Sequence, residues 1–309
     1  MNQKQFLDDP EVAEFVTWLA GFAGRVPIEL DIGSSARVPQ GVVKTVHGFD
    51  GVIDTYVWRA DWTDDRGSSV KSLCWDSTAR SLKRLAETLR AALASESDEA
   101  AMRACHAIFE WGGERNISVG ARPFLEAKRA SGQLVTYLKA AREAFRLSSG
   151  RLDQLGAIED VNSMLTKVYA LASDDGLPIY DSRVAAAMAS LVELFRIKTR
   201  RAWRQVPARL LFPTMDASAR RKLIGLHTGA LISKGALMHY TQPDMPARWA
   251  SAKLRLGWIA EDLLRQAPQL LSAQPHSRLH AFEASLFMIG YDVRCLAGNL
   301  NGTQTIDTK

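Results

Sequence analysis

The chain contains 309 residues with a mass of 34.1 kDa; 47% of the residues are hydrophobic, 24% are charged, and the formal net charge is +5. These proportions are typical of a globular protein and argue against global disorder, a collagen-like repeat or a coiled-coil fibre. No apolar run approaches the ~18 residues that a membrane span needs, and the acidic, polar N-terminus is unlike a signal peptide. We therefore expect a cytoplasmic protein with no membrane partner.

In the first quarter of the chain, the spacing of the hydrophobic residues changes from the helical to the strand period. Residues 11–23 place four apolar side chains on one helical stripe: Val12, Phe15, Leu19 and Phe22. Residues 42–49 and 52–60 alternate as strands do, and the Asp50-Gly51 pair between them suits a type I′ turn. These patterns predict a β-hairpin over 42–60, and residues 69–74 are a candidate third strand.

From Asp76 onward the period is helical. We expect Asp76 or Ser77 to cap a helix whose inward side chains are Leu82, Leu85, Leu89 and Leu93. Further helices are expected at roughly 98–110, 121–130, 133–147, 158–173, 182–199, 217–238, 247–266 and 277–297. Strands that come first and helices that follow predict an α+β protein that is mainly α, with a small antiparallel sheet portion before a helical body. We place the two domains at 1–95 and 96–309.

Residues that hold metals or nucleotides are sparse in this sequence. The three cysteines are far apart and form no Cys-x-x-Cys pair: Cys74, Cys105 and Cys295. The glycine-rich nucleotide motifs, the Gly-x-Ser-x-Gly elbow and the His-Glu-x-x-His motif are absent. We therefore expect no metal ion and no cofactor.

The segment 164–188 carries the clearest chemical pattern. Lys167 lies beside an apolar helical stripe, and Asp181 directly precedes the run Ser-Arg-Val-Ala-Ala-Ala-Met, where it can serve as the helix N-cap. Backbone N–H groups and the helix dipole favour a charged carboxylate at that position, and a fixed anion stabilises a developing cation. A lysine at an apolar boundary has a lowered pKa, which frees its amine for nucleophilic attack. Both groups suit cleavage of the bond between deoxyribose and base, because its transition state resembles an oxocarbenium ion.

These residues resemble a known catalytic segment. Thr166-Lys-Val168 and Pro178-Ile-Tyr-Asp-Ser-Arg-Val184 look like the catalytic segment of helix-hairpin-helix DNA glycosylases, in particular the 8-oxoguanine DNA glycosylase-like branch. The resemblance implies that Lys167 is the Schiff-base nucleophile and that Asp181 stabilises the sugar cation. It further implies a monomeric DNA N-glycosylase, a hydrolase that flips a modified base out of double-stranded DNA, with a possible associated AP-lyase activity.

The hairpin before the lysine differs from the family pattern Leu-Pro-Gly-x-Gly. Residues 161–165 are Val-Asn-Ser-Met-Leu, without the glycines that bring backbone N–H groups close to a DNA phosphate. This difference favours a specialised target. Bacterial relatives that this sequence resembles include an anti-phage glycosylase that removes glucosylated hydroxymethylcytosine from phage DNA. Excision of that base is therefore our first expectation, and an 8-oxoguanine-type repair glycosylase is the alternative.

Positive charge is concentrated in one segment. Residues 196–222 contain nine basic residues and one acidic residue, so the net positive charge of this segment is larger than that of the whole chain. We expect contacts with DNA phosphates from Arg183, Arg196, Lys198, Arg200, Arg201 and Arg204. Trp111 and Asn116, beside paired glycines at a helix end, are weaker candidates for a base pocket. A non-catalytic DNA-binding protein and a helical protein-interaction module are the competing interpretations.

Overall fold

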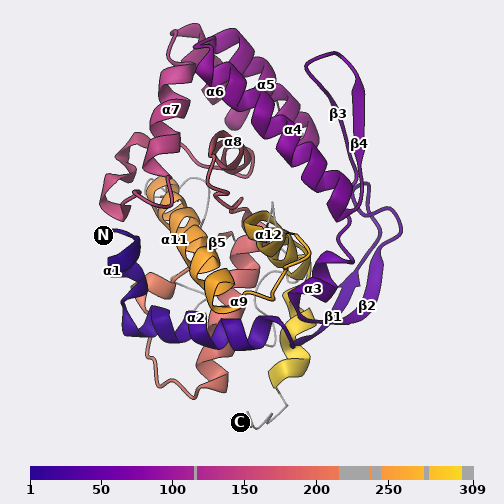
Figure 1. Ribbon diagram of the computed structural model, residues 1–309, viewed down its shortest axis with the longest axis vertical. Coiled ribbons are helices and arrows are strands. Elements are labelled where there is room, and N and C mark those ends of the chain that lie inside the picture. Colours follow the sequence, from indigo (N-terminus) through magenta and orange to yellow (C-terminus); the bar gives the residue numbers. More distant parts are fainter. Residues whose placement is uncertain (115–116, 216–236, 239–244, 275–277, 301–309) are drawn as a thin grey trace.

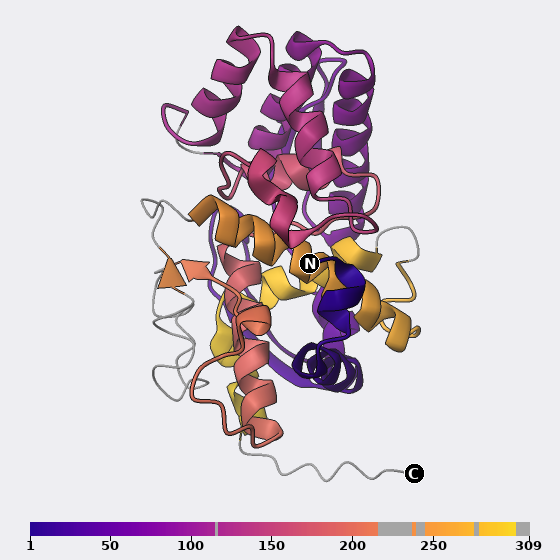
Figure 2. The same cartoon turned by 90° about the vertical axis from the view of Figure 1, so that its left-hand side faces the viewer.

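The computed structural model describes residues 1–114, 117–215, 237–238, 245–274 and 278–300. Helices dominate the described chain and the strands form short two-stranded pairs, which confirms the expected α+β, mainly α class. Figures 1 and 2 show the helices in two groups, one built from residues 75–172 and the other from the N-terminal helices together with those after residue 181. The chain between residues 172 and 182 connects the two groups.

The N-terminus forms two helices, α1 (Gln3–Leu7) and α2 (Pro10–Ala23). The carboxylate of Asp9 caps α2 by accepting hydrogen bonds from the backbone N–H groups of Glu11 and Val12, and Pro10 occupies the first helical position. Three side chains of the expected stripe are buried: Val12, Phe15 and Leu19. The structure thus confirms the helix expected at 11–23.

The expected β-hairpin over 42–60 is wrong. β2 (Val42–His47) is a strand, but its antiparallel partner is β1 (Pro27–Ile32), and residues 48–53 form a short helix, α3 (Gly48–Ile53). Gly48 has a φ of +66° and packs against the Gly24 carbonyl, so the chain turns there. Asp50-Gly51 consequently lies inside α3, where Phe49, Val52 and Ile53 are buried.

The second antiparallel pair joins β3 (Ala60–Thr63) to β4 (Ser69–Ser72), which confirms the candidate strand near 69–74. The helix that follows, α4 (Trp75–Ala94), has Cys74 as its N-cap residue and no side-chain cap, so the expected capping by Asp76 or Ser77 is wrong. The hydroxyl of Ser77 donates to the Cys74 carbonyl instead. The leucines expected to face inward from α4 are buried.

The first helical group continues with α5 (Asp98–Gly112), α6 (Ala121–Ala130) and α7 (Leu134–Ala144). A 3₁₀ segment, η1 (Leu152–Ala157), then leads to α8 (Leu165–Ala172). The helix expected at 158–173 is therefore shorter than predicted. The side chain of Asn162 accepts hydrogen bonds from the N–H groups of Met164 and Leu165, which fixes the helix start there.

The second group contains α9 (Ser182–Lys198), α11 (Met245–Gln266) and α12 (Arg278–Ile289), with short 3₁₀ segments η2 (Ala208–Leu210) and η4 (Val293–Leu300). The helix expected at 217–238 lies outside the described residues except for its last two, which form β6 (Leu237–Met238) parallel to β5 (Thr214–Met215). The helix expected at 277–297 is interrupted, because α12 ends at Ile289 and Gly290 lies against the backbone of Arg183.

Contacts between elements cross residue 95, the expected domain boundary. α2 packs on α9 and α11, α3 packs on α12, and β1 lies beside η4. On the other side of the molecule, α4 packs on α5 and α8. Within the described ranges, no helix combines the length and the apolar character needed to cross a membrane.

Candidate active site

Lys167 lies on α8 and its side chain is buried, with 7% of the residue exposed. Its Nζ donates to the carbonyl of Ser163, one helical turn earlier, at 2.6 Å. The aliphatic part passes over Gly112 at the end of α5, where an added Cβ would lie 3.0 Å from Lys167 Cδ. Among the described residues Lys167 forms no ion pair with a carboxylate. Burial lowers its pKa, and the negative charges of Asp181 and Glu283 oppose that shift.

Asp181 is the N-cap residue of α9, as the sequence predicts. Its Oδ1 accepts hydrogen bonds from the backbone N–H groups of Arg183 at 2.9 Å and Val184 at 3.1 Å. Its Oδ2 accepts no hydrogen bond from any residue that the structure describes. The side chain is nevertheless buried, at 6% exposure. The carboxylate is thus fixed at the positive end of a helix with one oxygen left for another partner.

A network of hydrogen bonds links the backbone beside Lys167 to the backbone beside Asp181. The N–H of Tyr180 donates to Thr166 Oγ1 at 2.9 Å, and the buried Nζ of Lys253 on α11 donates to the carbonyls of Thr166 and Pro178. The indole of Trp249 donates to the Tyr180 carbonyl at 2.8 Å. Thr166 and Tyr180 directly precede Lys167 and Asp181, so the network fixes where the catalytic candidates stand.

Glu283 and Lys253 are two buried charged residues at this site that the sequence analysis missed. Glu283 on α12 is 5% exposed, burial raises its pKa, and Lys167 and Asp181 are among the charges that act on it. Burial also lowers the pKa of Lys253 to about 7. The sequence did contain a signal for Glu283, which is the single charged residue in the otherwise mainly apolar run Ala281-Phe-Glu283-Ala-Ser-Leu-Phe287. Such residues are rarely buried without a specific partner.

Arg183 was expected to contact DNA, but its guanidinium lies among aromatic rings. Its Cζ is 4.1 Å from the ring centroid of Tyr291, 4.7 Å from that of Phe287 and 5.7 Å from that of Trp58. Its Nε is buried without a hydrogen-bond partner in the described residues. These cation–π contacts hold the first turn of α9, and with it Asp181, against α12.

Of the two candidates for a base pocket, Trp111 is buried near Lys167, and Asn116 lies outside the described residues. Trp111 immediately precedes Gly112, the residue that contacts Lys167. Its carbonyl accepts from the indole of Trp58 at 3.2 Å, and its own indole N–H is buried with no acceptor among the described residues. Trp111 therefore has a buried indole N–H without an acceptor in the described residues, one position before the glycine that Lys167 contacts.

The basic segment lies at the opposite end of α9, ~25 Å from Asp181 by helix length, and acidic side chains neutralise part of it. The guanidinium of Arg196 pairs with Glu193 at 2.7 Å, and Arg201 pairs with Glu11 and Glu14 of α2. Arg200 and Arg204 are exposed, and Lys198 is half-buried. The structure thus separates the basic segment, although not Arg183, from Lys167 and Asp181, and only some of its side chains are exposed.

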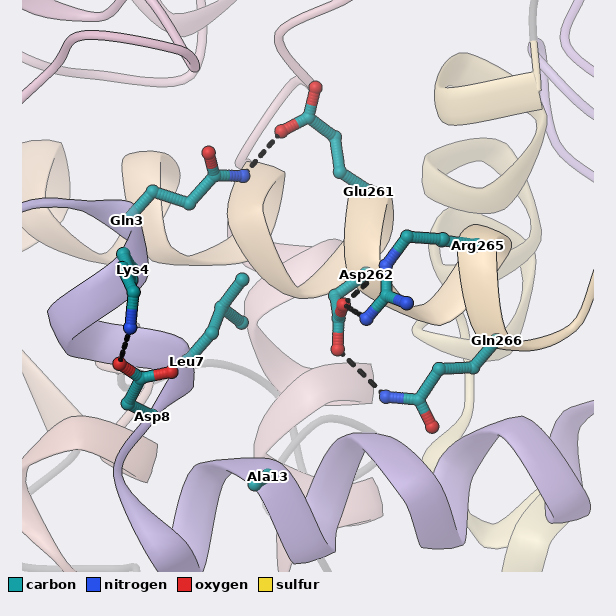
Figure 3. A pocket seen from close by; sticks show the side chains of 9 residues that line it. All are labelled: Gln3, Lys4, Leu7, Asp8, Ala13, Glu261, Asp262, Arg265 and Gln266. Atoms are coloured by element: carbon teal, nitrogen blue, oxygen red, sulfur yellow. Dashed lines mark hydrogen bonds and ion pairs between the residues drawn. The ribbon is translucent and has the colours of Figure 1, made fainter.

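A groove of about 520 Å³ between α1, α2 and α11 is a second place where polar side chains gather (Figure 3). Its polar side chains satisfy one another: Gln3 donates to Glu261, Lys4 pairs with Asp8, and Arg265 and Gln266 both donate to Asp262. A site that binds a ligand needs unused donors or acceptors, so this groove is not the candidate active site.

Among the described residues, histidine, cysteine and carboxylate side chains form no group of three that could hold a metal ion. Comparison with protein-family models, with curated proteins and with solved structures gives no match. The chemistry of the site therefore has to be inferred from the side chains themselves.

Proposed function

We propose that the protein is a monomeric DNA N-glycosylase that flips a modified base out of double-stranded DNA and cleaves its glycosidic bond. The observation that carries this proposal is that a hydrogen bond between Tyr180 and Thr166 fixes the residues directly before a buried lysine, Lys167, and an N-cap aspartate, Asp181. The arrangement supplies a nucleophile and a stabilising anion in a site that is shielded from water.

Asp181 suits the stabilisation of a sugar cation. Two backbone N–H groups and the helix dipole stabilise its negative charge, and the helix cap fixes its direction. As the bond from C1′ to the base nitrogen breaks, positive charge develops on C1′ and the ring oxygen. A carboxylate that is already oriented stabilises this charge without reorganisation. The unused Oδ2 is the atom available for this contact.

Lys167 suits the role of nucleophile. Because burial lowers the pKa of its ammonium group, a larger fraction of the side chain is the neutral amine near neutral pH. The lone pair of the amine forms the new bond to C1′ while the electron pair of the glycosidic bond leaves with the base. The covalent sugar adduct can then open to a Schiff base, which is the intermediate of an associated AP-lyase reaction.

Borohydride trapping tests this proposal. The protein is incubated with duplex DNA that contains glucosylated hydroxymethylcytosine, 8-oxoguanine or an abasic site, and cyanoborohydride or borohydride is added. We expect base release and a covalent adduct that Lys167→Met abolishes, whereas Lys139→Met keeps it, because Lys139 is a half-buried lysine on α7 that pairs with Glu96. Release from glucosylated phage DNA alone supports a defence role, and release of 8-oxoguanine alone supports repair.

The same assay separates the competing interpretation of a non-catalytic DNA-binding protein. That interpretation predicts salt-dependent binding of duplex DNA that is unchanged in Lys167→Met and Asp181→Asn, with no base released by any variant. Absence of both base release and adduct formation with all three substrates would overturn the glycosylase proposal.

A further inference from the structure

Glu283 faces the connection between α8 and α9, as the packing of α12 shows. Leu279, Glu283 and Phe287 are spaced i, i+4, i+8 and therefore form one stripe on this helix. At one end of the stripe, the Leu279 side chain lies against Gly176, where an added Cβ would be 2.9 Å from its Cδ1. At the other end, Phe287 lies under the guanidinium of Arg183. The middle residue must therefore face the segment that contains Asp181.

Several ionisable groups from the surrounding elements act on Glu283. They are Lys167 on α8, Asp181 at the start of α9, Lys253 on α11, Tyr56 before β3, and His280 on α12 itself. The only one within ion-pair distance is His280, whose Nδ1 lies 3.8 Å from Glu283 Oε2. Glu283 is thus a second buried carboxyl group of the same site.

The two carboxyl groups have different environments. Asp181 accepts two backbone hydrogen bonds at a helix N-terminus, which stabilise its charge. Glu283 lies in the middle of a buried helix, and no backbone N–H of the described residues donates to it. Burial raises the pKa of Glu283 and the negative charge of Asp181 adds to the effect, whereas His280 and Lys167 oppose it. Paired carboxyl groups whose environments differ in this way divide into a fixed anion and a proton donor.

We propose that Glu283 is the general acid that protonates the departing base, an inference that rests on the proposed glycosylase function. In this step the bond between C1′ and the base nitrogen breaks, and its electron pair moves into the base. The carboxyl proton of Glu283 transfers to a ring nitrogen or carbonyl oxygen of the base, which leaves as a neutral molecule. The Lys167 amine forms the new bond to C1′ and becomes a secondary ammonium group, and after the base has left this group gives its proton to the Glu283 carboxylate.

The test is the pH dependence of single-turnover base release from a duplex oligonucleotide that contains glucosylated hydroxymethylcytosine or 8-oxoguanine. The wild-type rate should fall as the pH rises through the ionisation of Glu283, whose pKa burial raises above the ordinary range of a glutamate. Glu283→Gln should react at least about 100-fold more slowly and should lack that high-pH limb. A purely structural role would change the rate without removing the limb.

Glu261→Gln is the matched control, because burial also raises the pKa of Glu261, a half-buried carboxyl group that lies in the groove of Figure 3, hydrogen-bonded to Gln3. It should keep the wild-type rate and pH profile. If Glu283→Gln does not fold, the wild-type profile decides, since a rate that does not fall at any pH above the ordinary range of a glutamate pKa overturns the inference. If Glu283→Gln folds and keeps the wild-type rate and pH profile, the role of Glu283 is overturned but the glycosylase proposal is not. If the wild-type protein releases no base, both are overturned.

Discussion

The backbone N–H of Tyr180 donates a hydrogen bond to the hydroxyl oxygen of Thr166 at 2.9 Å. Each residue directly precedes a member of the candidate catalytic pair, so this one contact links the backbone positions of Lys167 and Asp181. Lys253 reinforces it by donating to both oxygens of Thr166. Buried polar contacts therefore fix the relative positions of Lys167 and Asp181, although the two residues are fourteen positions apart in the sequence.

The first prediction concerns Thr166. Replacing it with valine keeps the shape of the side chain but removes the acceptor of the Tyr180 N–H, which is buried. We expect Thr166→Val to lower the free energy of unfolding by about 1–3 kcal/mol and to slow base release, because a buried donor is left without a partner. Thr166→Ser retains the hydroxyl and should restore most of both. Urea unfolding and single-turnover kinetics measure the two effects, and wild-type values for Thr166→Val would show that this bond is dispensable.

The second prediction separates the two roles of Asp181. Asparagine is as good an N-cap as aspartate, so Asp181→Asn should change the melting temperature little, but it removes the negative charge. We expect base release to fall by at least about 100-fold. Asp181→Ala should in addition lose about 1 kcal/mol of stability, because the first turn of α9 loses its cap. An Asp181→Asn variant that releases base at the wild-type rate would exclude the carboxylate from the chemistry.

The third prediction uses Gly112. A methyl group on this residue would meet Lys167 Cδ and Met164 Sδ, each at 3.0 Å, so the flexible lysine side chain has to move. We expect Gly112→Ala to fold but to form the borohydride adduct several-fold more slowly, because the amine is displaced from its approach to C1′. Gly24→Ala is the control, since a Cβ there meets nothing within 4 Å. Equal trapping rates in both variants would contradict the placement of Lys167.

Local signals predicted much of the helical framework and the Asp181 cap. The bounds of α6 agree with the expected 121–130, and α2 and α9 agree to within about a residue, because an apolar stripe and helix-end residues define these helices. The alternation of Ile28, Leu30 and Ile32 in β1 was present in the sequence but was not used. The Asp50-Gly51 pair, in contrast, predicted a turn that the burial of Phe49 and Val52 against other elements overrides.

The buried part of the site could not be predicted in the same way. The apolar run around Glu283 indicates a buried helix, but the sequences of α11 and α12 do not indicate which groups surround Glu283 and Lys253. Their environment arises only when α11 and α12 pack against the connection before α9, through contacts such as Trp249–Tyr180 and Lys253–Pro178 that span 69 and 75 residues of sequence. Whether a basic residue is available to DNA likewise depends on tertiary contacts, such as those of Arg201 with α2.

The fourth prediction compares the exposed arginines of the basic segment with an ion-paired one. Arg200 and Arg204 are exposed, whereas the guanidinium of Arg196 is held by Glu193. If the basic segment contacts phosphates, the double variant Arg200→Ala/Arg204→Ala should reduce the slope of log affinity against log salt by about 2, because two fewer counterions are released. Arg196→Ala should leave the slope near the wild-type value. Fluorescence anisotropy with an unmodified duplex measures both, and an unchanged slope in the double variant would place the DNA elsewhere.

The fifth prediction concerns Lys253, whose pKa burial lowers to about 7 in the folded protein. The unfolded chain, with an ordinary lysine pKa near ~10.4, binds more protons than the folded protein between about pH 7 and pH 10. The contribution of this residue to the free energy of unfolding therefore rises with pH in that window, by up to about 1.4 kcal/mol per pH unit, and is constant below it.

Lys253→Met removes the contribution, so the stability of wild type relative to the variant should increase from pH 7 to pH 10. Urea unfolding across this range measures the difference, and a difference that is independent of pH would mean that Lys253 keeps its proton in the folded state.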